Sequence, residues 1–309
     1  MPEGHSVRRL ARQFGDAFGG RRLAVSSPQG RFAAGAALLD GYTLVAADAH
    51  GKHLFLHFDH GLVLHVHLGL YGAWSFGGDR TFAGASSIGA PRRVGERETP
   101  AAADDGGASY AGPPPPVGAV RVRLASSHGW ADLRGATTCA AITAVEAAAV
   151  SARLGPDPLR NVRGDAARFA ARLRGRRTPL AALLMDQAVI AGVGNVYRAE
   201  VLFRRRLDPW LPGSAVEDAA ARRLWRELAV LMNDGVADGR IITTPARYWN
   251  GGSADPQQRI ALKSAEYPEA ADAHYVYKRE GLPCRVCRTT VLLADLAGRK
   301  LYWCPSCQD

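Results

Sequence analysis

Four of the five cysteines in this 309-residue chain lie in one short stretch near its end, and their spacing limits what that stretch can form. Cys284 and Cys287 make one C-x2-C pair, and Cys304 and Cys307 make a second pair after a spacer of sixteen residues. Two such pairs supply four thiolates to one tetrahedral zinc ion, which leaves no coordination position for water or substrate. The sequence therefore predicts a structural zinc site rather than a catalytic one.

The segment between the two cysteine pairs has the pattern of a short β-hairpin. Two apolar runs, VLLADL at 291–296 and KLYW at 300–303, flank the turn AGR at 297–299. We expect a two-stranded zinc ribbon with Arg299 at its tip. An arginine on a rigid turn can bind a phosphate through two hydrogen bonds, although an arginine in such a place is more often only a solvated loop charge.

The fifth cysteine, Cys139, stands alone, and this uneven distribution does not suit the disulfide framework of a secreted protein. No apolar run approaches the roughly 18 residues that a membrane span needs, and the charged start is unlike a signal peptide. We therefore expect a cytoplasmic protein.

The charge of the chain indicates an anionic partner. Lysine and arginine number 39 against 29 aspartates and glutamates, which gives a formal charge of +10 and an isoelectric point near 9.7. Nucleic acid is the first candidate and an acidic membrane the second. A biased genome composition would explain why arginine is preferred to lysine, but it would not explain the net charge.

The order of the patterns predicts an α+β protein of several domains. Residues 1–142 are β-rich, with a hairpin over 53–68 and further strands within 20–48 and at 119–124. Residues 77–118 are rich in Gly, Ala, Ser and Pro. Such a segment cannot bury enough apolar surface to order itself, so we expect a disordered insertion.

A helical part over 143–262 and a cysteine-bearing part over 274–309 follow. The capping box TAVE at 143–146 starts a helix that ends at LGPDP, residues 154–158. The other expected helices span 165–174, 179–188, 195–206 and 214–233, the last starting with a second capping box, SAVE, at 214–217.

The N-terminus carries an unusual candidate nucleophile. A small residue after Met1 allows removal of that methionine, and Pro2 would then present a secondary amine, which no side chain offers. The apolar residues of an amphipathic helix recur from Val7 to Phe14, so the first residues are fixed to a rigid body. Glu3 lies near the N-terminus of that helix, where the dipole favours a carboxylate.

Two further candidates concern phosphate binding. The Gly-rich turn before Asn195 presents backbone N–H groups at a helix N-terminus, which suits one phosphate, although such corners also serve packing alone. Lys52 precedes the hairpin. Its side chain is expected to lie either in a cleft or, as is common at the end of a strand, in solvent. Six histidines lie within 50–67, but their alternation fits strand faces better than a metal site.

Several motifs occur together and in order: PEGH, GKHLF, HLGLYG, LGPDPL, LMDQ, AGVGNVYRAEVLF, VYKREGLPCRVC and GRKLYWCPSCQ. In these the chain resembles the formamidopyrimidine-DNA glycosylase / endonuclease VIII family, and PEGH and LYG are nearer the endonuclease VIII branch. The resemblance implies a β-sandwich domain with flanking helices, a helix-two-turn-helix domain and a zinc finger, with DNA held between the domains. It also implies a monomer with one structural zinc ion, associated with the nucleoid, acting on DNA that contains oxidised bases or abasic sites.

The same resemblance assigns roles in catalysis. Pro2 would be the Schiff-base nucleophile and Glu3 the acid. Lys52 would contact phosphate and assist proton transfer in strand cleavage. Asn195 and Arg299 would bind phosphates at the lesion.

It also assigns residues to the gap left by an extruded base. Leu70 and Tyr71 would fill this gap, and Arg134 would lie near it. Gly69 departs from the family, because a longer gap-filling side chain often stands at that position.

The resemblance implies a bifunctional DNA glycosylase and AP lyase of base-excision repair, acting on oxidised pyrimidines by β,δ-elimination. One alternative is a glycosylase for oxidised purines such as 8-oxoguanine or formamidopyrimidine. A second, from another class, is a non-catalytic protein that binds damaged DNA. The presence of Pro2, Glu3 and Lys52 together argues against the second alternative, since binding alone needs none of them.

Overall fold

The computed structural model describes residues 2–90, 110, 112–249 and 267–309. The chain divides into two compact units, Met1–Arg153 and Leu154–Asp309, and each has its own hydrophobic core. Within the described ranges, no helix is long and apolar enough to cross a membrane.

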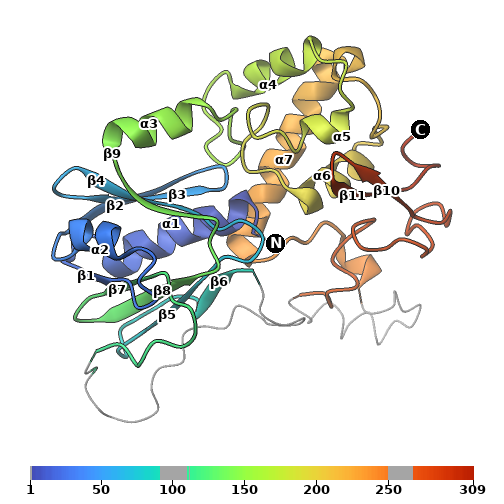
Figure 1. Cartoon of the computed structure of the whole chain (residues 1–309). Coiled ribbons are helices and arrows are strands. Elements are labelled where there is room, and N and C mark those ends of the chain that lie inside the picture. Colours follow the sequence, from blue (N-terminus) through green and yellow to red (C-terminus); the bar gives the residue numbers. More distant parts are fainter. Residues whose placement is uncertain (1, 91–109, 111, 250–266) are drawn as a thin grey trace. The chain divides into compact units, whose positions relative to one another are not determined.

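Two antiparallel sheets form the first unit, so the predicted β-sandwich is confirmed (Figure 1). The five-stranded sheet has the order β1-β7-β8-β5-β6 and the four-stranded sheet the order β2-β3-β4-β9. In chain order the elements are α1 (Gly4–Phe18), β1 (Ala24–Ser26), α2 (Ala33–Leu39), β2 (Leu44–His50), β3 (His53–Phe58), β4 (Leu62–His67), β5 (Ala73–Gly78), β6 (Ser87–Gly89), β7 (Val122–Ala125), β8 (Gly129–Arg134), β9 (Thr138–Thr143) and α3 (Ala144–Ala152).

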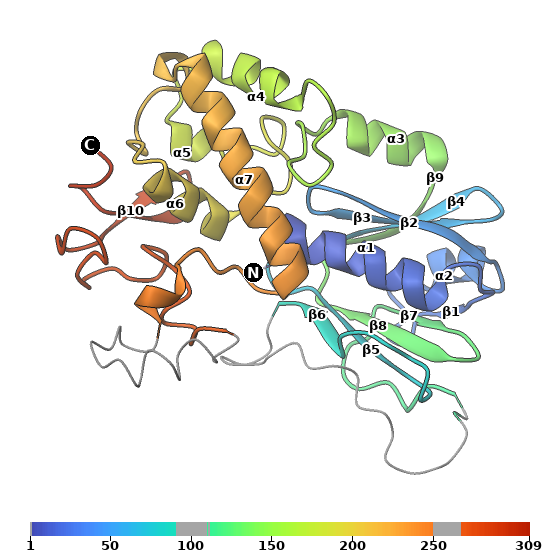
Figure 2. The same ribbon diagram turned by 180° about the vertical axis from the view of Figure 1, so that it is seen from behind.

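Helix α1 lies between the two sheets, as Figures 1 and 2 show from opposite sides. Its predicted apolar face is buried, and Phe14 contacts Trp74 edge-on with ring centroids 4.8 Å apart. Since both sheets pack against this one helix, its N-terminus is held as firmly as the core itself.

The predicted hairpin over 53–68 is confirmed, because β3 and β4 pair in the register His53↔His67. Alternate residues of β3, including Leu54 and Leu56, enter the core, and His53 and Phe55 lie on the opposite face. Helix α2 was not predicted from the sequence, since its alanine-rich stretch carries no clear 3.6-residue pattern.

The expectation of disorder over 77–118 is wrong for part of that range. Ser87–Gly89 forms β6, which pairs with β5, and Ile88 is buried against the core. Phe82 and Ala85 also pack against that core, and the Gln13 amide bonds both backbone groups of Ala85 at 2.9 Å. Contacts with distant residues therefore order a segment whose composition predicts disorder. Residues 91–109 and 111 of the expected insertion lie outside the described residues. Its last residues, 112–118, form a short stretch before β7.

The capping box at Thr143 and Glu146 is formed as expected and starts α3. This helix packs on the four-stranded sheet, where Ala147 contacts Phe55 and Val63. It therefore belongs to the first unit, whereas the sequence pattern placed the boundary before it, at residue 142.

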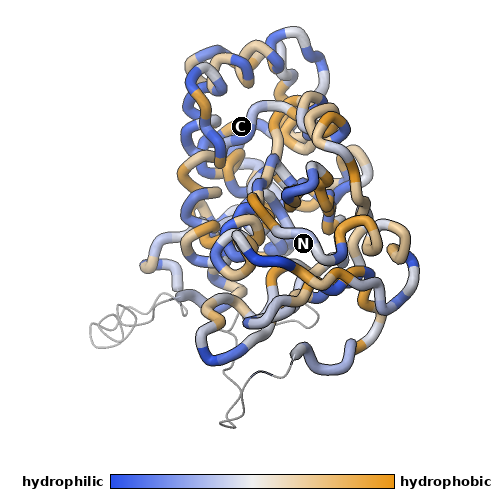
Figure 3. Tube along the Cα trace, turned by 90° about the vertical axis from the view of Figure 1, so that its left-hand side faces the viewer, coloured by the Kyte–Doolittle hydropathy of each residue, from blue (hydrophilic) through white to orange (hydrophobic). Residues whose placement is uncertain are grey.

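Helices form most of the second unit, which also contains the cysteine-bearing hairpin. Its elements are α4 (Asp165–Arg174), α5 (Leu180–Leu183), α6 (Asn195–Arg204), the 3-10 turn η1 (Gly213–Ala215), α7 (Asp218–Asp238), the 3-10 turn η2 (Ala246–Tyr248), β10 (Leu292–Leu296) and β11 (Arg299–Trp303). Along the helices the colours of Figure 3 alternate between hydrophobic and hydrophilic, as expected where one face is buried.

Two of the predicted helices differ in extent. The helix expected over 179–188 is reduced to the four residues of α5. The capping box expected at SAVE does not form, because Ser214 lies in η1 and α7 starts only after Glu217. Helix α7 then runs on to Asp238 and ends at Gly239, whose φ of 71° suits glycine.

The predicted zinc-ribbon hairpin is confirmed. Strands β10 and β11 pair in the register Leu296↔Arg299 around the two-residue turn Ala297-Gly298. Both turn residues have positive φ, 52° and 71°, which matches the tight turn that the twist of a two-stranded ribbon favours. Arg299 therefore stands at the tip, and its side chain is exposed.

Candidate active site and zinc centre

Pro2 and Glu3 are buried at the start of α1. Glu3 is the N-cap residue, and its carbonyl oxygen accepts hydrogen bonds from the backbone N–H groups of Ser6 and Val7. Its side chain is 0 % exposed. A carboxylate at this point gains from the helix dipole, so Glu3 is an acid fixed one residue from the proline nitrogen.

A neutral histidine follows this pair in the first turn of α1. His5 is buried, and its Nε2 lies 3.1 Å from the hydroxyl oxygen of Ser6. Burial, with smaller contributions from the charges of Arg9 and the chain's N-terminus, lowers the pKa of His5 to about 3. The imidazole is therefore uncharged near neutral pH.

Lys52 lies in the tight turn between β2 and β3, after Gly51, whose φ is 58°. His67 is paired with His53, the residue after Lys52. Burial, and then the charge of Lys52, lowers the pKa of His67. The turn therefore fixes Lys52 at the end of the four-stranded sheet.

Histidines line the outer face of this sheet beside Lys52. His53 Nδ1 lies 2.8 Å from His65 Nε2, and the His65 ring stacks on Phe55 with centroids 5.0 Å apart. Burial, with neighbouring histidines as a smaller cause, lowers the pKa of His53 to about 3 and that of His65 to about 4. In the part of the chain that the structure describes, the four C-terminal cysteines are the group placed to hold a metal ion.

Leu70 and Tyr71 lie together in the turn between β4 and β5. Tyr71 is 80 % exposed and Leu70 is 38 % exposed, so both side chains are available for contact. Gly69 before them has φ 67°, and a Cβ atom there would collide with the hydroxyl oxygen of Thr137. The backbone therefore explains why no longer side chain stands at position 69.

Arg134 lies at the end of β8, where its guanidinium makes three hydrogen bonds. It donates hydrogen bonds to Val117 O at 2.7 Å, Ser75 Oγ at 3.1 Å and Asp132 Oδ2 at 3.2 Å. These contacts hold the segment before β7 against the sheet. They show a structural role for Arg134, and its predicted role near the gap stays a prediction.

The Gly-rich turn before α6 is held together by Gln187, which was not among the predicted site residues. Its amide oxygen accepts from Gly192 N at 2.9 Å, and its nitrogen donates to Met185 O and Val193 O. Gly192 has φ 87°. The side chain thus fixes the loop whose N–H groups lead into the N-terminus of α6.

Asn195 and the ribbon tip, which are far apart in the sequence, meet in the structure. Asn195 Nδ2 donates to Lys300 O at 3.0 Å, one residue after Arg299. Arg198, fully buried on the next turn of α6, donates to Lys300 O at 2.8 Å and to Asn195 Oδ1. The N-terminus of α6 and the exposed Arg299 therefore belong to one cationic surface.

A buried carboxylate holds the segment before the ribbon against α6. Glu200 is 0 % exposed, and its oxygens accept from the Thr243 hydroxyl and from the backbone N–H groups of Tyr275, Val276 and Tyr277. Sequence reasoning missed Glu200 and Arg198, although a signal existed. Charged residues inside the apolar run VYRAEVLF are expected only where each has a partner.

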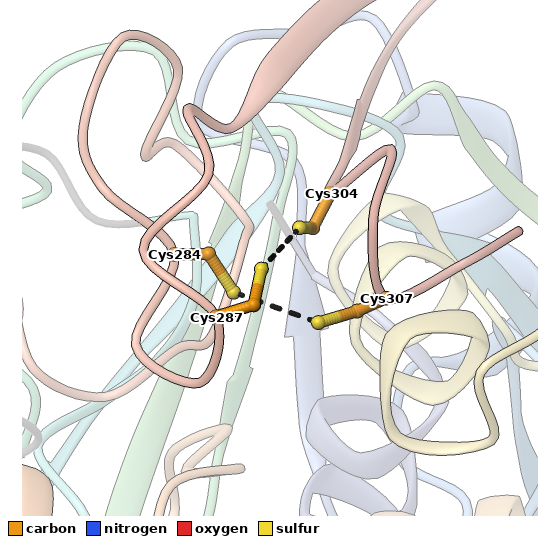
Figure 4. Close-up of side chains that lie close together, drawn as sticks. All are labelled: Cys284, Cys287, Cys304 and Cys307. Atoms are coloured by element: carbon orange, nitrogen blue, oxygen red, sulfur yellow. Dashed lines mark hydrogen bonds between the residues drawn. The ribbon is translucent and has the colours of Figure 1, made fainter.

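The four predicted zinc ligands come together at the base of the ribbon (Figure 4). The sulfur atoms all lie within 4.8 Å of one another, with Cys287 and Cys304 at 3.3 Å and Cys284 and Cys307 at 4.0 Å. Zinc–sulfur bonds of about 2.3 Å in a tetrahedron need sulfur atoms about 3.8 Å apart, so the set fits one zinc ion. With four thiolates the ion is structural and holds the turn that presents Arg299.

Three family models match the chain in the order of its parts. The formamidopyrimidine-DNA glycosylase N-terminal domain matches residues 1–139, the formamidopyrimidine-DNA glycosylase H2TH domain matches 154–246, and the zinc finger found in FPG and IleRS matches 281–309. The chain belongs to the formamidopyrimidine-DNA glycosylase family. It is therefore a DNA glycosylase and AP lyase of base-excision repair, and its zinc finger is the cysteine site of Figure 4.

Known glycosylases of this family match over the whole chain. The protein named Endonuclease 8 1 of Mycobacterium tuberculosis is 42% identical over 308 residues, which cover 100% of both chains. The crystal structure of MutM (FPG) from Thermus thermophilus aligns with a TM-score of 0.64 at 26% identity, over 99% of this chain and 98% of that chain. A Lactococcus lactis FPG mutant bound to Fapy-dG DNA aligns over 100% of both chains with a TM-score of 0.70, and at 19% identity this shows the fold alone.

Proposed function

We propose that this glycosylase removes oxidised pyrimidines from DNA through a Schiff base on the nitrogen of Pro2. The observation that carries the proposal is the buried Pro2-Glu3 pair at the start of α1, which puts a secondary amine and an acid at a fixed point. An α-amino group has a pKa of about 8, so a usable fraction is neutral near pH 7, whereas a lysine at about 10.4 needs strong tuning.

Base removal needs only these two residues of the first unit. The lone pair of the Pro2 nitrogen forms a bond to C1′ while the bond from C1′ to the damaged base breaks, and the base leaves with that electron pair and takes up a proton. The attached nitrogen then gives up its own proton. Its lone pair forms the C1′=N bond as the C1′–O4′ bond breaks, so that the sugar ring opens, O4′ takes up a proton and a positively charged iminium remains. Glu3 protonates the ring oxygen or the departing base.

Strand cleavage follows from that positive charge. The iminium acidifies C2′, a base removes the proton, and the C3′–O bond breaks to release the 3′ phosphate by β-elimination. A second elimination breaks the C5′–O bond and releases the 5′ phosphate. Lys52 assists these proton transfers, and its fixed position in the turn after β2 supports this role.

Four other residues bind the DNA in this proposal. Asn195, at the N-terminus of α6, and the exposed Arg299 contact phosphates, since they share one cationic surface. Leu70 and Tyr71 fill the gap left by the flipped nucleotide, as their exposure suggests. Because the substrate is chromosomal DNA, the protein works with the bacterial nucleoid in the cytoplasm.

The preference for pyrimidines rests on the PEGH start, the LYG turn and the full-length similarity to Endonuclease 8 1. Duplexes of equal length that carry one thymine glycol or one 8-oxoguanine test it. We expect the higher kcat/KM on thymine glycol. A higher value on 8-oxoguanine would establish the oxidised-purine alternative, while leaving the Pro2 mechanism intact.

The role of Glu3 has a separate test. Glu3→Gln should lose excision of thymine glycol, but it should still cleave a preformed abasic site, since that step needs no base protonation. Equal loss of both activities would assign Glu3 to the lyase step as well.

A further inference from the structure

A second cationic site lies at the C-terminal end of α6. A cavity of about 310 Å³ opens there between α6, α7 and the base of the zinc ribbon. Three consecutive arginines line it, Arg204, Arg205 and Arg206, together with Glu227. Guanidinium groups have the fork geometry that suits the oxygens of a phosphate.

Two of the arginines are held in place by one carboxylate. Arg204 Nε donates to Glu227 Oε1 at 2.5 Å and its Nη1 donates to Thr243 O at 2.6 Å. Arg205 Nη1 lies 3.9 Å from Glu227 Oε2. Glu227 therefore orients both guanidinium groups, and it compensates the charge of only one of the three arginines.

Arg206 takes part in ending α6, because its N–H donates to Phe203 O and the N–H of Leu207 donates to Leu202 O, both at 3.0 Å. It follows the last turn of α6 with φ 52°, a left-handed conformation that glycine adopts without strain and that other residues adopt at a cost of about 1 kcal/mol. Its side chain is exposed, and within the described ranges no ion pair or side-chain hydrogen bond holds it. The backbone conformation is that of a helix end, whereas the exposed guanidinium lines a cavity beside two oriented arginines, which points to an anionic ligand.

The cavity is separate from the phosphate surface near Asn195. That residue starts α6 and Arg204 ends it, and a helix of ten residues is about 15 Å long. One phosphate group cannot contact both ends. The cavity is therefore an additional site and does not belong to the lesion-binding surface described above.

We propose that this cavity is a second anion site, which binds a phosphoryl group through Arg204, Arg205 and Arg206. The ligand is either a phosphate of the DNA backbone outside the lesion or a free phosphorylated molecule such as a nucleotide. A purely structural role competes with this proposal, because Cys307 also lines the cavity and the four thiolates carry more negative charge than one zinc ion balances.

Calorimetric titration of the zinc-loaded full chain with inorganic phosphate tests the site. We expect two binding events in the wild type, of which Arg206→Ala loses one by a weakening of at least about tenfold. Arg299→Ala should lose the other event. Arg223→Ala, which removes one exposed charge from α7 outside the cavity, should keep both.

Three readouts separate a binding role from a structural one. Arg206→Gly should lose the same event while its melting temperature stays equal to or above that of wild type, because glycine relieves the strained backbone. Arg206→Ala should retain one zinc ion per chain and should incise a short lesion duplex at the wild-type rate. Unchanged phosphate binding in Arg206→Ala, or loss of zinc from it, would overturn the proposal.

Undamaged DNA identifies the source of the phosphoryl group. If the site binds DNA, Arg206→Ala should weaken binding to a 40-base-pair duplex and reduce the salt dependence by about one ion. If the site binds a free ligand, a nucleoside monophosphate should compete with inorganic phosphate and DNA binding should not change. Either result would support a phosphoryl-binding site in this cavity. The two results differ only in which molecule supplies the phosphoryl group.

Discussion

Acidification is expected to destabilise the first unit through three histidines, of which His5 and His65 are buried and His53 is partly buried. The pKa values of His5 and His53 are lowered to about 3 and that of His65 to about 4, in each case mainly by burial. In the unfolded chain a histidine titrates near 6.5, so below that pH the unfolded state binds protons that the folded state does not bind. Their stabilising contribution is therefore complete above about pH 7 and is lost as the pH falls from 6.5 toward 3.

The size of the effect follows from the difference in pKa. At pH 5, each fully buried histidine contributes about 2 kcal/mol less than at pH 7.5, since 1.5 pH units correspond to about 2 kcal/mol. His53 is partly exposed and contributes less. Together the three histidines should lower the free energy of unfolding by about 5 kcal/mol.

Hydrogen exchange of peptides from β3 and β4 measures this change at pH 7.5 and pH 5, after correction for the intrinsic exchange rate. The variant His65→Phe keeps the stack on Phe55 and removes one titrating group, so its pH dependence should be about one third smaller. Equal opening free energies at the two pH values would refute the reasoning. If the pH dependence of His65→Phe equalled that of the wild type, His65 would not contribute to the loss of stability in acid.

Three further perturbations have expected outcomes. Glu200→Gln replaces an acceptor oxygen by a donor among four hydrogen-bond donors, so urea denaturation should show a loss of about 3 kcal/mol, and a loss below 1 kcal/mol would contradict the account. Chelation of zinc should expose the four ligand thiols to iodoacetamide at pH 7.5 and abolish DNA incision. Cys139 should react far more slowly, because burial raises the pKa of its thiol to about 12. Rapid labelling of Cys139, measured by mass spectrometry, would contradict this. Gly69→Gln should lower the melting temperature by several degrees through the collision with Thr137, and an unchanged melting temperature would show that the turn can adapt.

Local patterns in the sequence were sufficient for much of this fold. The zinc hairpin, the helix at Asp165–Arg174 and the capping box at Thr143 follow from spacing, periodicity and a two-residue exchange of hydrogen bonds. Each of these signals is complete within a few residues. The structure adds little to them except distances.

Features that depend on distant contacts could not be read in the same way. Strand β6 is ordered by its pairing with β5 and by the packing of Ile88 on a core formed elsewhere in the chain. The assignment of α3 to the first unit depends on its contact with Phe55 and Val63. The same holds for the site. Glu200 acquires its partners from residues 43 to 77 positions away, so its identity as an anchor appears only in the fold.

Borohydride reduction of the enzyme mixed with a thymine-glycol duplex, followed by mass mapping of the crosslinked peptide, is the most direct test of the proposed chemistry. We predict a single adduct on the nitrogen of Pro2 in a chain that has lost Met1, and no adduct in an N-terminally extended form. An adduct on Lys52, or full activity of a chain that retains Met1, would contradict the account.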